Sequence, residues 1–376
     1  MKNPVITDEQ TLEEVIRCLA ENLPLHTQGP CDQRTIFEIL LRAASIGDSV
    51  ENTCKTLQDV PCGNDIRYHL EKYDDMAELE INLNRALQDR LPPRIYKGKQ
   101  VIAADINLIP YYGTPNPAEE PYICKSKAKA GTCSFYAYAT LYVVRKGKRI
   151  TAAITSVRRD DTDVAIITRL LDRISPLNLR IKRLLIDRGF FSVPVIRWLK
   201  ALDIPFEMPV IIRGKTGGTR QLIRGGRSYE TLYTMNSQRY GSVTFRVRVI
   251  CVYSMGKYGR QGLAYFAYAV HRINLKLRAV HEDYRKRFGI ETSYRIKNTC
   301  RIKTSTKNPA VRFLFVGLAF ILTDIWVRLI WEHVSMPHKG GRLLFHELFP
   351  LKRMLAFLRQ ATDSKHTLIN AVFIVG

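Results

Sequence analysis

The stretch from Val101 to Ile212 alternates strand-like and helix-like patterns, and this order restricts the fold more than any other feature of the chain. Three strands come first, because their residues are apolar, β-branched and aromatic. Segments with helical spacing then alternate with two further strands. The expected strands cover residues 101–105, 133–144, 150–157, 183–187 and 206–212, and the expected helices cover 163–174 and 193–202. Elements in this order predict a mixed α/β sheet covered by helices.

Helical patterns fill the first part of the chain, up to residue 98. The dipeptide Pro92-Pro93 ends the last of these helices and marks the first expected domain boundary. Three short helices separated by tight turns resemble a helix-turn-helix module, in which the segment after Gly63 would be the DNA-recognition helix. A plain helical bundle that only packs against the rest of the chain is the alternative.

A glycine-rich segment interrupts the alternation after residue 213. Its turns separate strand-like pieces at 242–253 and 262–270, so we expect a β-rich insertion there. Helical sequence resumes after it, and a basic segment ends the chain. The expected divisions are residues 1–98 (helical, DNA-binding), 99–213 (first part of the sheet core), 214–270 (insertion), 271–335 (second part of the core) and 336–376 (basic C-terminal segment).

The segment 311–331 is apolar enough to raise the question of a membrane span. Arg312, Asp324 and Arg328 interrupt it, and its uncharged part is shorter than the ~18–20 residues that a span needs. The segment therefore predicts a helix buried in a large core, and we expect no membrane association.

The net charge of +23, with a sequence pI near 9.8, indicates a polyanionic partner, and nucleic acid is the usual one. The first residues are followed by an acidic helical pattern rather than by the apolar core of a signal peptide. The 8 cysteines include no C-x2-C pair, which favours reduced thiols over a zinc site. We expect a cytoplasmic protein associated with the nucleoid.

Two of the expected strands end in an acidic residue, Asp105 and Asp187. If the strands are neighbours, both carboxylates lie at the carboxyl edge of the sheet, where ligands gather in such folds. Their repulsion requires a positive partner, and a hard cation such as Mg²⁺ takes carboxylate oxygens. Glu291, on a later helix, would complete a site for two ions about 3.5–4 Å apart that cuts or joins phosphodiesters. Taken singly, each acid could instead form a turn, a helix cap or a salt bridge.

The later helix carries the pattern Y-x2-R-x3-E, whose spacings of three and four place the three side chains on one face. This pattern and the two strand-end acids together resemble the DDE transposases of prokaryotic insertion sequences. The matching sequences are Ala103-Ala-Asp105, Leu185-Ile-Asp187-Arg-Gly-Phe-Phe and Tyr284-x2-Arg287-x3-Glu291. The resemblance covers roughly residues 99–335. It is to the branch with a ribonuclease-H-like core and a β-strand insertion before the last acid.

The resemblance implies that Asp105, Asp187 and Glu291 are the catalytic residues and hold two Mg²⁺ ions, for which Mn²⁺ can substitute. It implies a transposase that cleaves and transfers DNA strands at the terminal inverted repeats of its own insertion sequence. In this branch the reaction is cut-and-paste, and the transposon end passes through a hairpin. The expected partners are double-stranded repeat and target DNA, with a homodimer in the DNA complex.

The resemblance also implies that Tyr284 and Arg287 hold a DNA phosphate near the cut end. Arginine binds phosphate oxygens bidentately, and tyrosine adds a hydroxyl donor. The family signature continues as Y-x2-R-x3-E-x6-K, but the residue at that last position is Asn298. Lys297, one position earlier, is the expected counterpart, and Arg295 is a further expected phosphate-binding residue.

Two other functions stay open at the level of the sequence. A DNA-binding protein without catalysis, such as a decayed or domesticated copy, would share the charge and the helical module, although all three acids are present. A structure-selective nuclease or an enzyme acting on RNA–DNA hybrids would share the core, but it needs neither the N-terminal helices nor the insertion.

Overall fold

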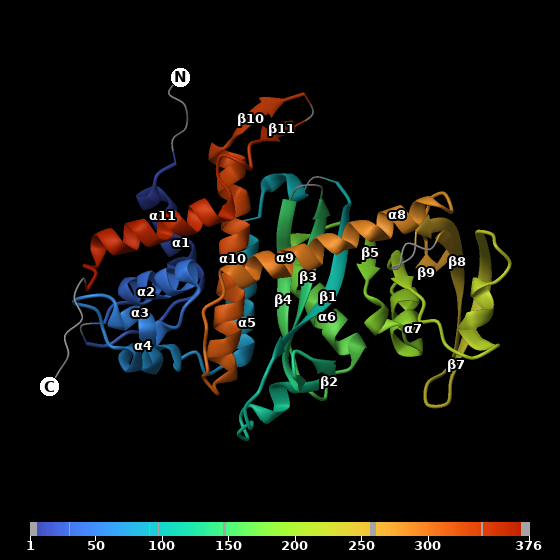
Figure 1. Cartoon of the computed structure of the whole chain (residues 1–376), viewed down its shortest axis with the longest axis horizontal. Coiled ribbons are helices and arrows are strands. Elements are labelled where there is room, and N and C mark those ends of the chain that lie inside the picture. Colours follow the sequence, from blue (N-terminus) through green and yellow to red (C-terminus); the bar gives the residue numbers. More distant parts are fainter. Residues whose placement is uncertain are drawn as a thin grey trace.

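The computed structural model describes residues 6–29, 31–89, 91–96, 98–145, 148–255, 261–339 and 341–369. The molecule is elongated, and the N-terminal helices, the central sheet and the insertion follow one another along its long axis (Figure 1). Buried hydrophobic residues form one continuous cluster, from Leu12 in the N-terminal helices to Val249 in the insertion. The predicted segments therefore share a core.

Among the described residues, nine strands form one large sheet. They are β1 (Gln100–Pro110), β2 (Ile123–Lys129), β3 (Thr132–Arg145), β4 (Lys148–Val157), β5 (Ile181–Ile186), β6 (Phe206–Pro209), β7 (Tyr229–Ser237), β8 (Gly241–Met255) and β9 (Gln261–His271). β3 is antiparallel to both β1 and β4, whereas β5 pairs in parallel with β1 and with β6. The order β4-β3-β1-β5-β6 is the ribonuclease-H-like arrangement, so the predicted fold class is confirmed.

The insertion extends the core sheet instead of standing apart from it. β9 pairs antiparallel with β6, from Phe206 opposite His271 to Pro209 opposite Tyr268. β8 then pairs with β9, and β7 with β8. Because β9 ends beside β6, the helical segment that follows β9 begins next to the core strands and crosses the sheet (Figure 1).

The helices of the core connect strands or cross the sheet. α6 and α7 provide the connections from β4 to β5 and from β5 to β6. After the insertion, α8, a short 3-10 turn and α9 form one continuous helical path across the sheet (Figure 1). α9 covers the face of β3 that carries Thr140, whose Oγ1 lies 2.7 Å from the hydroxyl of Tyr294. These helices are α6 (Asp163–Ile174), α7 (Val193–Ala201), α8 (Ala279–Arg285), the 3-10 turn Lys286–Phe288 and α9 (Gly289–Thr299).

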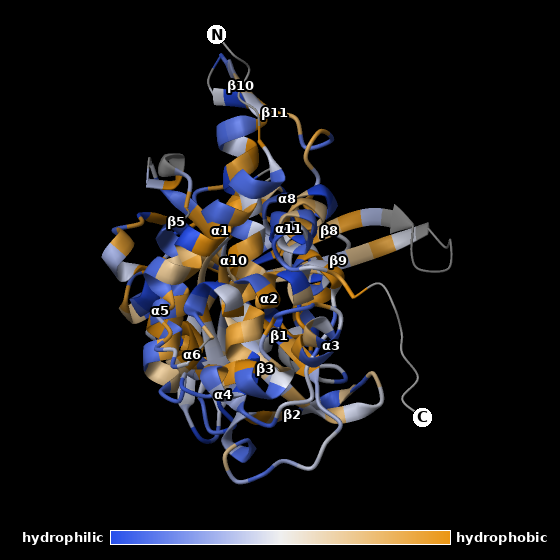
Figure 2. Ribbon diagram, turned by 90° about the vertical axis from the view of Figure 1, so that its left-hand side faces the viewer, coloured by the Kyte–Doolittle hydropathy of each residue, from blue (hydrophilic) through white to orange (hydrophobic). Residues whose placement is uncertain are grey.

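α10 (Pro309–His333) is long and apolar enough to cross a membrane, but 94% of its most apolar stretch is buried inside the protein. Figure 2 shows this hydrophobic helix in the middle of the molecule. It packs closely on α5 (Met76–Asp89), because a Cβ atom at Gly317 would lie 2.5 Å from the side chain of Leu83. Oδ1 of Asp324 accepts a hydrogen bond from the backbone of the core sheet. The helix is thus a core element, as its interrupted sequence predicts.

The remaining helices form a group at one end of the molecule (Figure 1). α11 belongs to the last predicted segment, yet it packs on α1 and α2, where Nε of Arg42 lies 2.6 Å from Oδ1 of Asp363. The candidate recognition helix is α4, and its role in DNA binding stays a prediction. These elements are α1 (Asp8–Asn22), α2 (Gln33–Ile46), α3 (Val50–Lys55), α4 (Gly63–Leu70) and α11 (Leu351–Lys365), with the hairpin β10 (Ser335–His338) and β11 (Gly341–Leu344) between α10 and α11.

Candidate active site

The parallel pairing of β1 with β5 brings the two strand-end acids together. Ala104 is paired with Ile186, so the next residues, Asp105 and Asp187, stand at the same level of the sheet. Contrary to the prediction, β1 does not end at Asp105 but continues along the sheet. β5 does end there, and Asp187 caps the following turn by accepting a hydrogen bond from the Gly189 nitrogen at 3.0 Å.

A single guanidinium group holds the two acids together. Nη2 of Arg287 lies 3.0 Å from Oδ1 of Asp105 and 3.0 Å from Oδ1 of Asp187, so the two oxygens are separated by at most twice that distance. The side chain of Arg287 is 4% exposed, and its Nε has no hydrogen-bond partner among the described residues. The guanidinium therefore supplies the positive partner that two neighbouring carboxylates require.

Asp105 is the more buried of the two acids, with 16% of its side chain exposed against 36% for Asp187. Burial raises the pKa of Asp105 to about 6; Asp187 and Glu291 add to the rise and the Arg287 guanidinium opposes it. Oδ1 of Asp105 also accepts a hydrogen bond from the Ile106 nitrogen at 2.9 Å. No described residue donates a hydrogen bond to its Oδ2, which leaves one oxygen for another partner.

Glu291 lies exposed in the first turn of α9, near enough for its charge to act on Asp105. In the described part of the chain, no three Asp, Glu, His or Cys side chains meet closely enough to hold a metal ion. The structure thus brings two of the three predicted ligands onto one cation, Arg287, and leaves Glu291 outside this contact. The donor set fits a hard divalent cation, because it consists of carboxylate oxygens and the aspartate pair already accepts a positive charge.

Tyr284 fastens the helical path to the sheet. Its hydroxyl donates a hydrogen bond to the carbonyl oxygen of Ile186 at 3.0 Å, and its side chain is buried. Burial raises the pKa of the Tyr284 phenol. The predicted phosphate-binding role of Tyr284 does not fit these contacts, because its hydroxyl is engaged by the residue before Asp187. The guanidinium of Arg287 is likewise engaged, by the two acids.

The two predicted phosphate-binding residues on α9 point in different directions. Arg295 is exposed, as a DNA contact requires. Lys297 is fully buried, its Nζ has no hydrogen-bond partner in the described structure, and Nζ lies 5.3 Å from the ring centroid of Phe320. The predicted phosphate contact of Lys297 is therefore wrong for this conformation. One residue of offset rotates a helical side chain by ~100°, and it is Asn298, at the position of the signature lysine, that is exposed.

The family follows from comparison with known proteins. The sequence matches the family model described as "Transposase DDE domain" over residues 96–324. The chain belongs to this family. A comparison with curated proteins gave no match. Among solved structures, the cryo-EM structure of a piggyBac transposase synaptic complex with hairpin DNA is similar, with a TM-score of 0.57 and 9% sequence identity over 96% of this chain and 82% of that chain. At this identity the likeness concerns the fold.

The transposase also holds a buried ionic cluster beneath α8 that the sequence patterns did not predict. Nη2 of Arg183 lies 2.5 Å from Oδ2 of Asp283, and its Nε lies 3.5 Å from Oε1 of Glu207. Burial, with the charge of Asp283 next, raises the pKa of Glu207 to about 8. Because Asp283 precedes Tyr284, the cluster helps to fix the start of the helical path over the acids. A charged residue inside an apolar strand, as Arg183 and Glu207 are, was the available signal.

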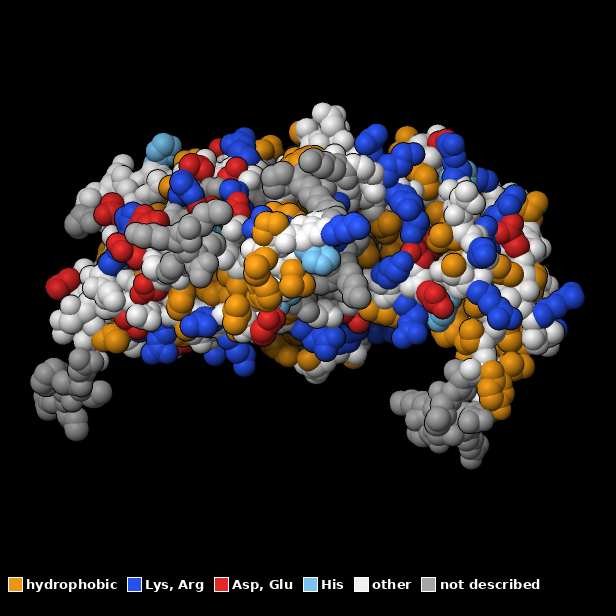
Figure 3. All heavy atoms as spheres, turned by 90° about the horizontal axis from the view of Figure 1, so that it is seen from above, with side chains coloured by type: hydrophobic (Ala, Val, Ile, Leu, Met, Phe, Trp, Pro, Cys, Tyr) orange, Lys and Arg blue, Asp and Glu red, His pale blue; other side chains and the backbone are white. Residues whose placement is uncertain are grey.

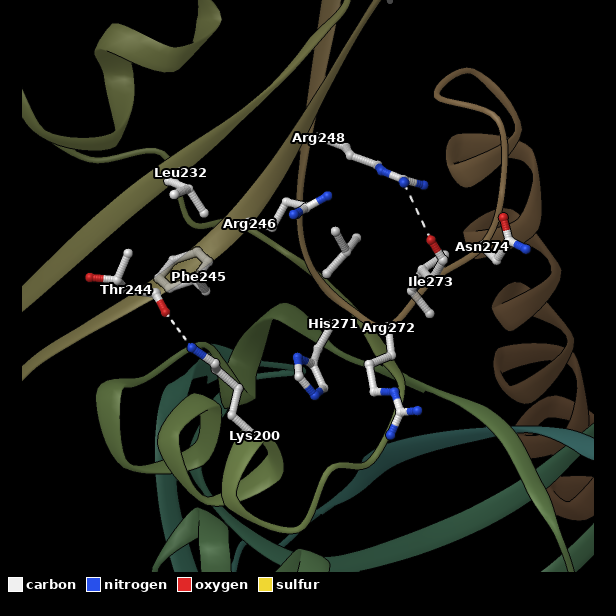
Figure 4. A pocket seen from close by; sticks show the side chains of 11 residues that line it. Lys200, Leu232, Thr244, Phe245, Arg246, Arg248, His271, Arg272, Ile273 and Asn274 are labelled. Atoms are coloured by element: carbon white, nitrogen blue, oxygen red, sulfur yellow. Dashed lines mark hydrogen bonds between the residues drawn. The ribbon is translucent and has the colours of Figure 1, made fainter.

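Basic side chains predominate over the half of the transposase that holds α8 and the insertion (Figure 3). Exposed cations on and beside α8 and α9 are Lys276, Arg278, Arg285, Lys286 and Arg295. A basic cavity of about 660 Å³ lies between α7 and the insertion, but its cations already have partners (Figure 4). Lys200 donates to the carbonyl oxygen of Thr244, and Arg248 pairs with Glu230 and donates to the carbonyl oxygen of Ile273.

Proposed function

We propose that the chain is an active DNA transposase that uses divalent metal ions to cleave and transfer strands at the terminal inverted repeats of its own insertion sequence. The observation that carries the proposal is the pair Asp105 and Asp187, held around one positive charge where β1 and β5 run side by side. The family and the net charge of +23 support DNA as the substrate.

Asp105, Asp187 and Glu291 would hold two Mg²⁺ ions, or Mn²⁺ in their place. When bound, such ions activate a water or a 3′-hydroxyl and stabilise the leaving oxygen. The Glu291 side chain is exposed, and it would turn toward the pair. Arg287, released from the carboxylates, would then bind the phosphate that is cut, because its planar fork matches two phosphate oxygens. Arg295 would contact the DNA backbone from the exposed side of α9.

The proposed route is cut-and-paste through a hairpin on the excised end. The piggyBac transposase that shares the fold was solved in a synaptic complex with hairpin DNA, and this is the precedent for the choice. Paired cleavage requires two ends to be held together, so the working form would be a homodimer on double-stranded repeat and target DNA. The protein would act in the cytoplasm, at the nucleoid.

Neutral replacements of the three acids test the proposal. Asp105→Asn, Asp187→Asn and Glu291→Gln are each measured for binding and for Mg²⁺-dependent nicking of a duplex that carries the terminal repeat. We expect binding to be kept and cleavage to fall by about a hundredfold or more, since metal-ion catalysis is worth several kcal/mol. Asp160→Asn is the matched control, because 80% of the Asp160 side chain is exposed, and it should cleave like the wild type.

Two outcomes would replace the proposal. A wild-type protein that binds the repeat but never cuts it with Mg²⁺ or Mn²⁺ would be a DNA-binding protein without catalysis. A protein that cuts RNA–DNA hybrids and leaves repeat duplexes intact would be a hybrid nuclease.

A further inference from the structure

A second basic cavity, of about 190 Å³, lies between the connection from α9 to α10 and the neighbouring strands β1 and β3. Its described lining contains three basic side chains, Arg301, Lys303 and Arg312, and no acidic one. Glu119, a buried carboxylate outside the lining, accepts hydrogen bonds from the hydroxyls of Tyr111 and Tyr136. The cavity is therefore positively charged without an internal counter-ion.

Arg301 differs from the cations of the larger cavity beside α7, because no described residue pairs with it. Arg301 is half-buried and makes no hydrogen bond or ion pair with any described residue. Burial lowers the pKa of Arg301, and the charge of Arg312 lowers it further. Nε of Arg312 donates to the carbonyl oxygen of Thr306 at 2.6 Å, and its Cζ lies 4.7 Å from the ring centroid of Tyr136. A half-buried cation without a partner is costly unless an anion joins it.

Tyr138 adds a hydroxyl to the same cavity. Its side chain is 1% exposed, and its ring stacks on Phe313 with centroids 5.6 Å apart. The hydroxyl has no hydrogen-bond partner in the described structure. Burial raises the pKa of Tyr138, and the charges of Arg312 and Arg301 oppose the rise, so both guanidinium groups lie near the phenol. Two guanidinium groups and a hydroxyl are donors suited to phosphate oxygens.

The cavity lies on the same face of the sheet as the acids. Across β1 and β3, Asp105 is opposite Thr140 and Asn107 is opposite Tyr138, and residues two apart on a strand share a face. Ile109, which lines the cavity, is four residues beyond Asp105, or ~13 Å along the strand. That distance is about four base-pair steps of 3.4 Å.

Resting on the proposed function, we propose that Arg301, Arg312 and Tyr138 form a phosphate-binding site for one backbone phosphate of the bound DNA, about four base pairs from the cut. The site would anchor the duplex on the path between the acids and the N-terminal helices. Arg301 is the residue to test, because its side chain supports no other described residue.

A scan with neutral phosphates tests the site. Each phosphate within about ten base pairs of the cut is replaced in turn by a methylphosphonate, and binding is measured without Mg²⁺ for the wild type and Arg301→Gln. We expect one replacement, about four base pairs from the cut, to weaken wild-type binding by about tenfold and to leave Arg301→Gln unaffected. The slope of log affinity against log salt should fall by about one in the variant.

A control variant and a milder variant distinguish loss of the phosphate contact from loss of the fold. Arg180→Gln removes an exposed arginine just before β5, at the end of that strand away from the acids, and should show the wild-type scan and salt slope. Tyr138→Phe removes only the hydroxyl and should weaken binding at the same phosphate by a smaller factor. Thermal unfolding of each variant shows that the fold is kept.

The proposal is overturned if Arg301→Gln responds to every neutral phosphate as the wild type does. Titration with inorganic phosphate in the absence of DNA addresses the other source of the same chemistry. If the wild type binds inorganic phosphate, Arg301→Gln does not, and the scan shows no coupling, the cavity holds free phosphate and the DNA assignment is refuted. If the wild type binds no repeat duplex, the proposed function is refuted. If the wild type binds the duplex but the scan shows no coupling, only the phosphate site is refuted.

Discussion

Replacing Lys297 by methionine separates two accounts of this residue. The family signature predicts a DNA contact, whereas the structure buries the side chain with no hydrogen-bond partner for Nζ among the described residues. Methionine keeps an unbranched chain of similar length and removes the charge. We expect Lys297→Met to stabilise the transposase and to leave its affinity for DNA unchanged.

The magnitude follows from the pKa of Lys297, which burial, helped by the charge of Arg301, lowers from 10.5 to about 7. Each pKa unit corresponds to about 1.36 kcal/mol, so burial of the protonated amine costs about 5 kcal/mol. Relaxation and water penetration reduce this cost, and replacing buried ionic groups by apolar ones often gains about 1–4 kcal/mol. We expect the free energy of unfolding to rise by about 2–4 kcal/mol at neutral pH.

The effect should depend on pH in a defined direction. Below about pH 7 both the folded and the unfolded protein bind the Lys297 proton, so the wild type carries the whole cost. As the pH rises from about 7 toward 10.5, the folded state releases the proton while the unfolded state keeps it. The wild type is therefore stabilised relative to the variant in that window, and the gap between the two proteins narrows.

Chemical denaturation across this pH range and a DNA-binding assay measure both quantities. Arg295→Met is the control, since it removes an exposed cation from the same helix two residues earlier. It should weaken DNA binding without a gain in stability. A Lys297→Met variant that is less stable than the wild type, or that loses as much DNA affinity as Arg295→Met, would contradict a buried, unpartnered amine at this position.

Three other changes have defined outcomes. Glu207, whose pKa burial raises from 4.5 to about 8, contributes stability that is fully present below about pH 4.5 and is lost as the pH rises from there to about 8, so Glu207→Gln should flatten this fall in denaturation curves. Gly317→Ala should lower the unfolding free energy by about 1–3 kcal/mol, because the new methyl group would clash with the side chain of Leu83. In a Leu83→Ala background, which lacks the clashing atoms, the same substitution should cost little. Tyr284→Phe removes the hydrogen bond to Ile186 and should cost about 1 kcal/mol. Single-turnover assays should show its cleavage rate falling more than its DNA affinity.

Most strands of the core sheet and the nearness of two acids could be predicted from the sequence alone. Apolar strands and helical spacing are local signals, and a strand-helix-strand order leaves few topologies, so Asp105 and Asp187 could be expected at neighbouring positions. Strands β2 and β7 were not predicted. In β2, Ile-Cys-Lys-Ser-Lys-Ala-Lys, the lysines alternate with small residues and not with large apolar ones, so the segment gives no signal of a buried face. Its pairing depends on β3, not on its own composition.

Only the tertiary structure decided what the charged side chains meet. Spacing showed that Tyr284 and Arg287 share a face of the helical path, but the contact of that face with the end of β5 depends on elements about a hundred residues away. Lys297 follows Ser293 and Tyr294 by four and three residues, so it lies with them on the face that packs inside. Helical periodicity gives the direction of a side chain relative to its neighbours on the helix. Packing of distant elements determines whether that direction leads to solvent, to an opposite charge or into the core.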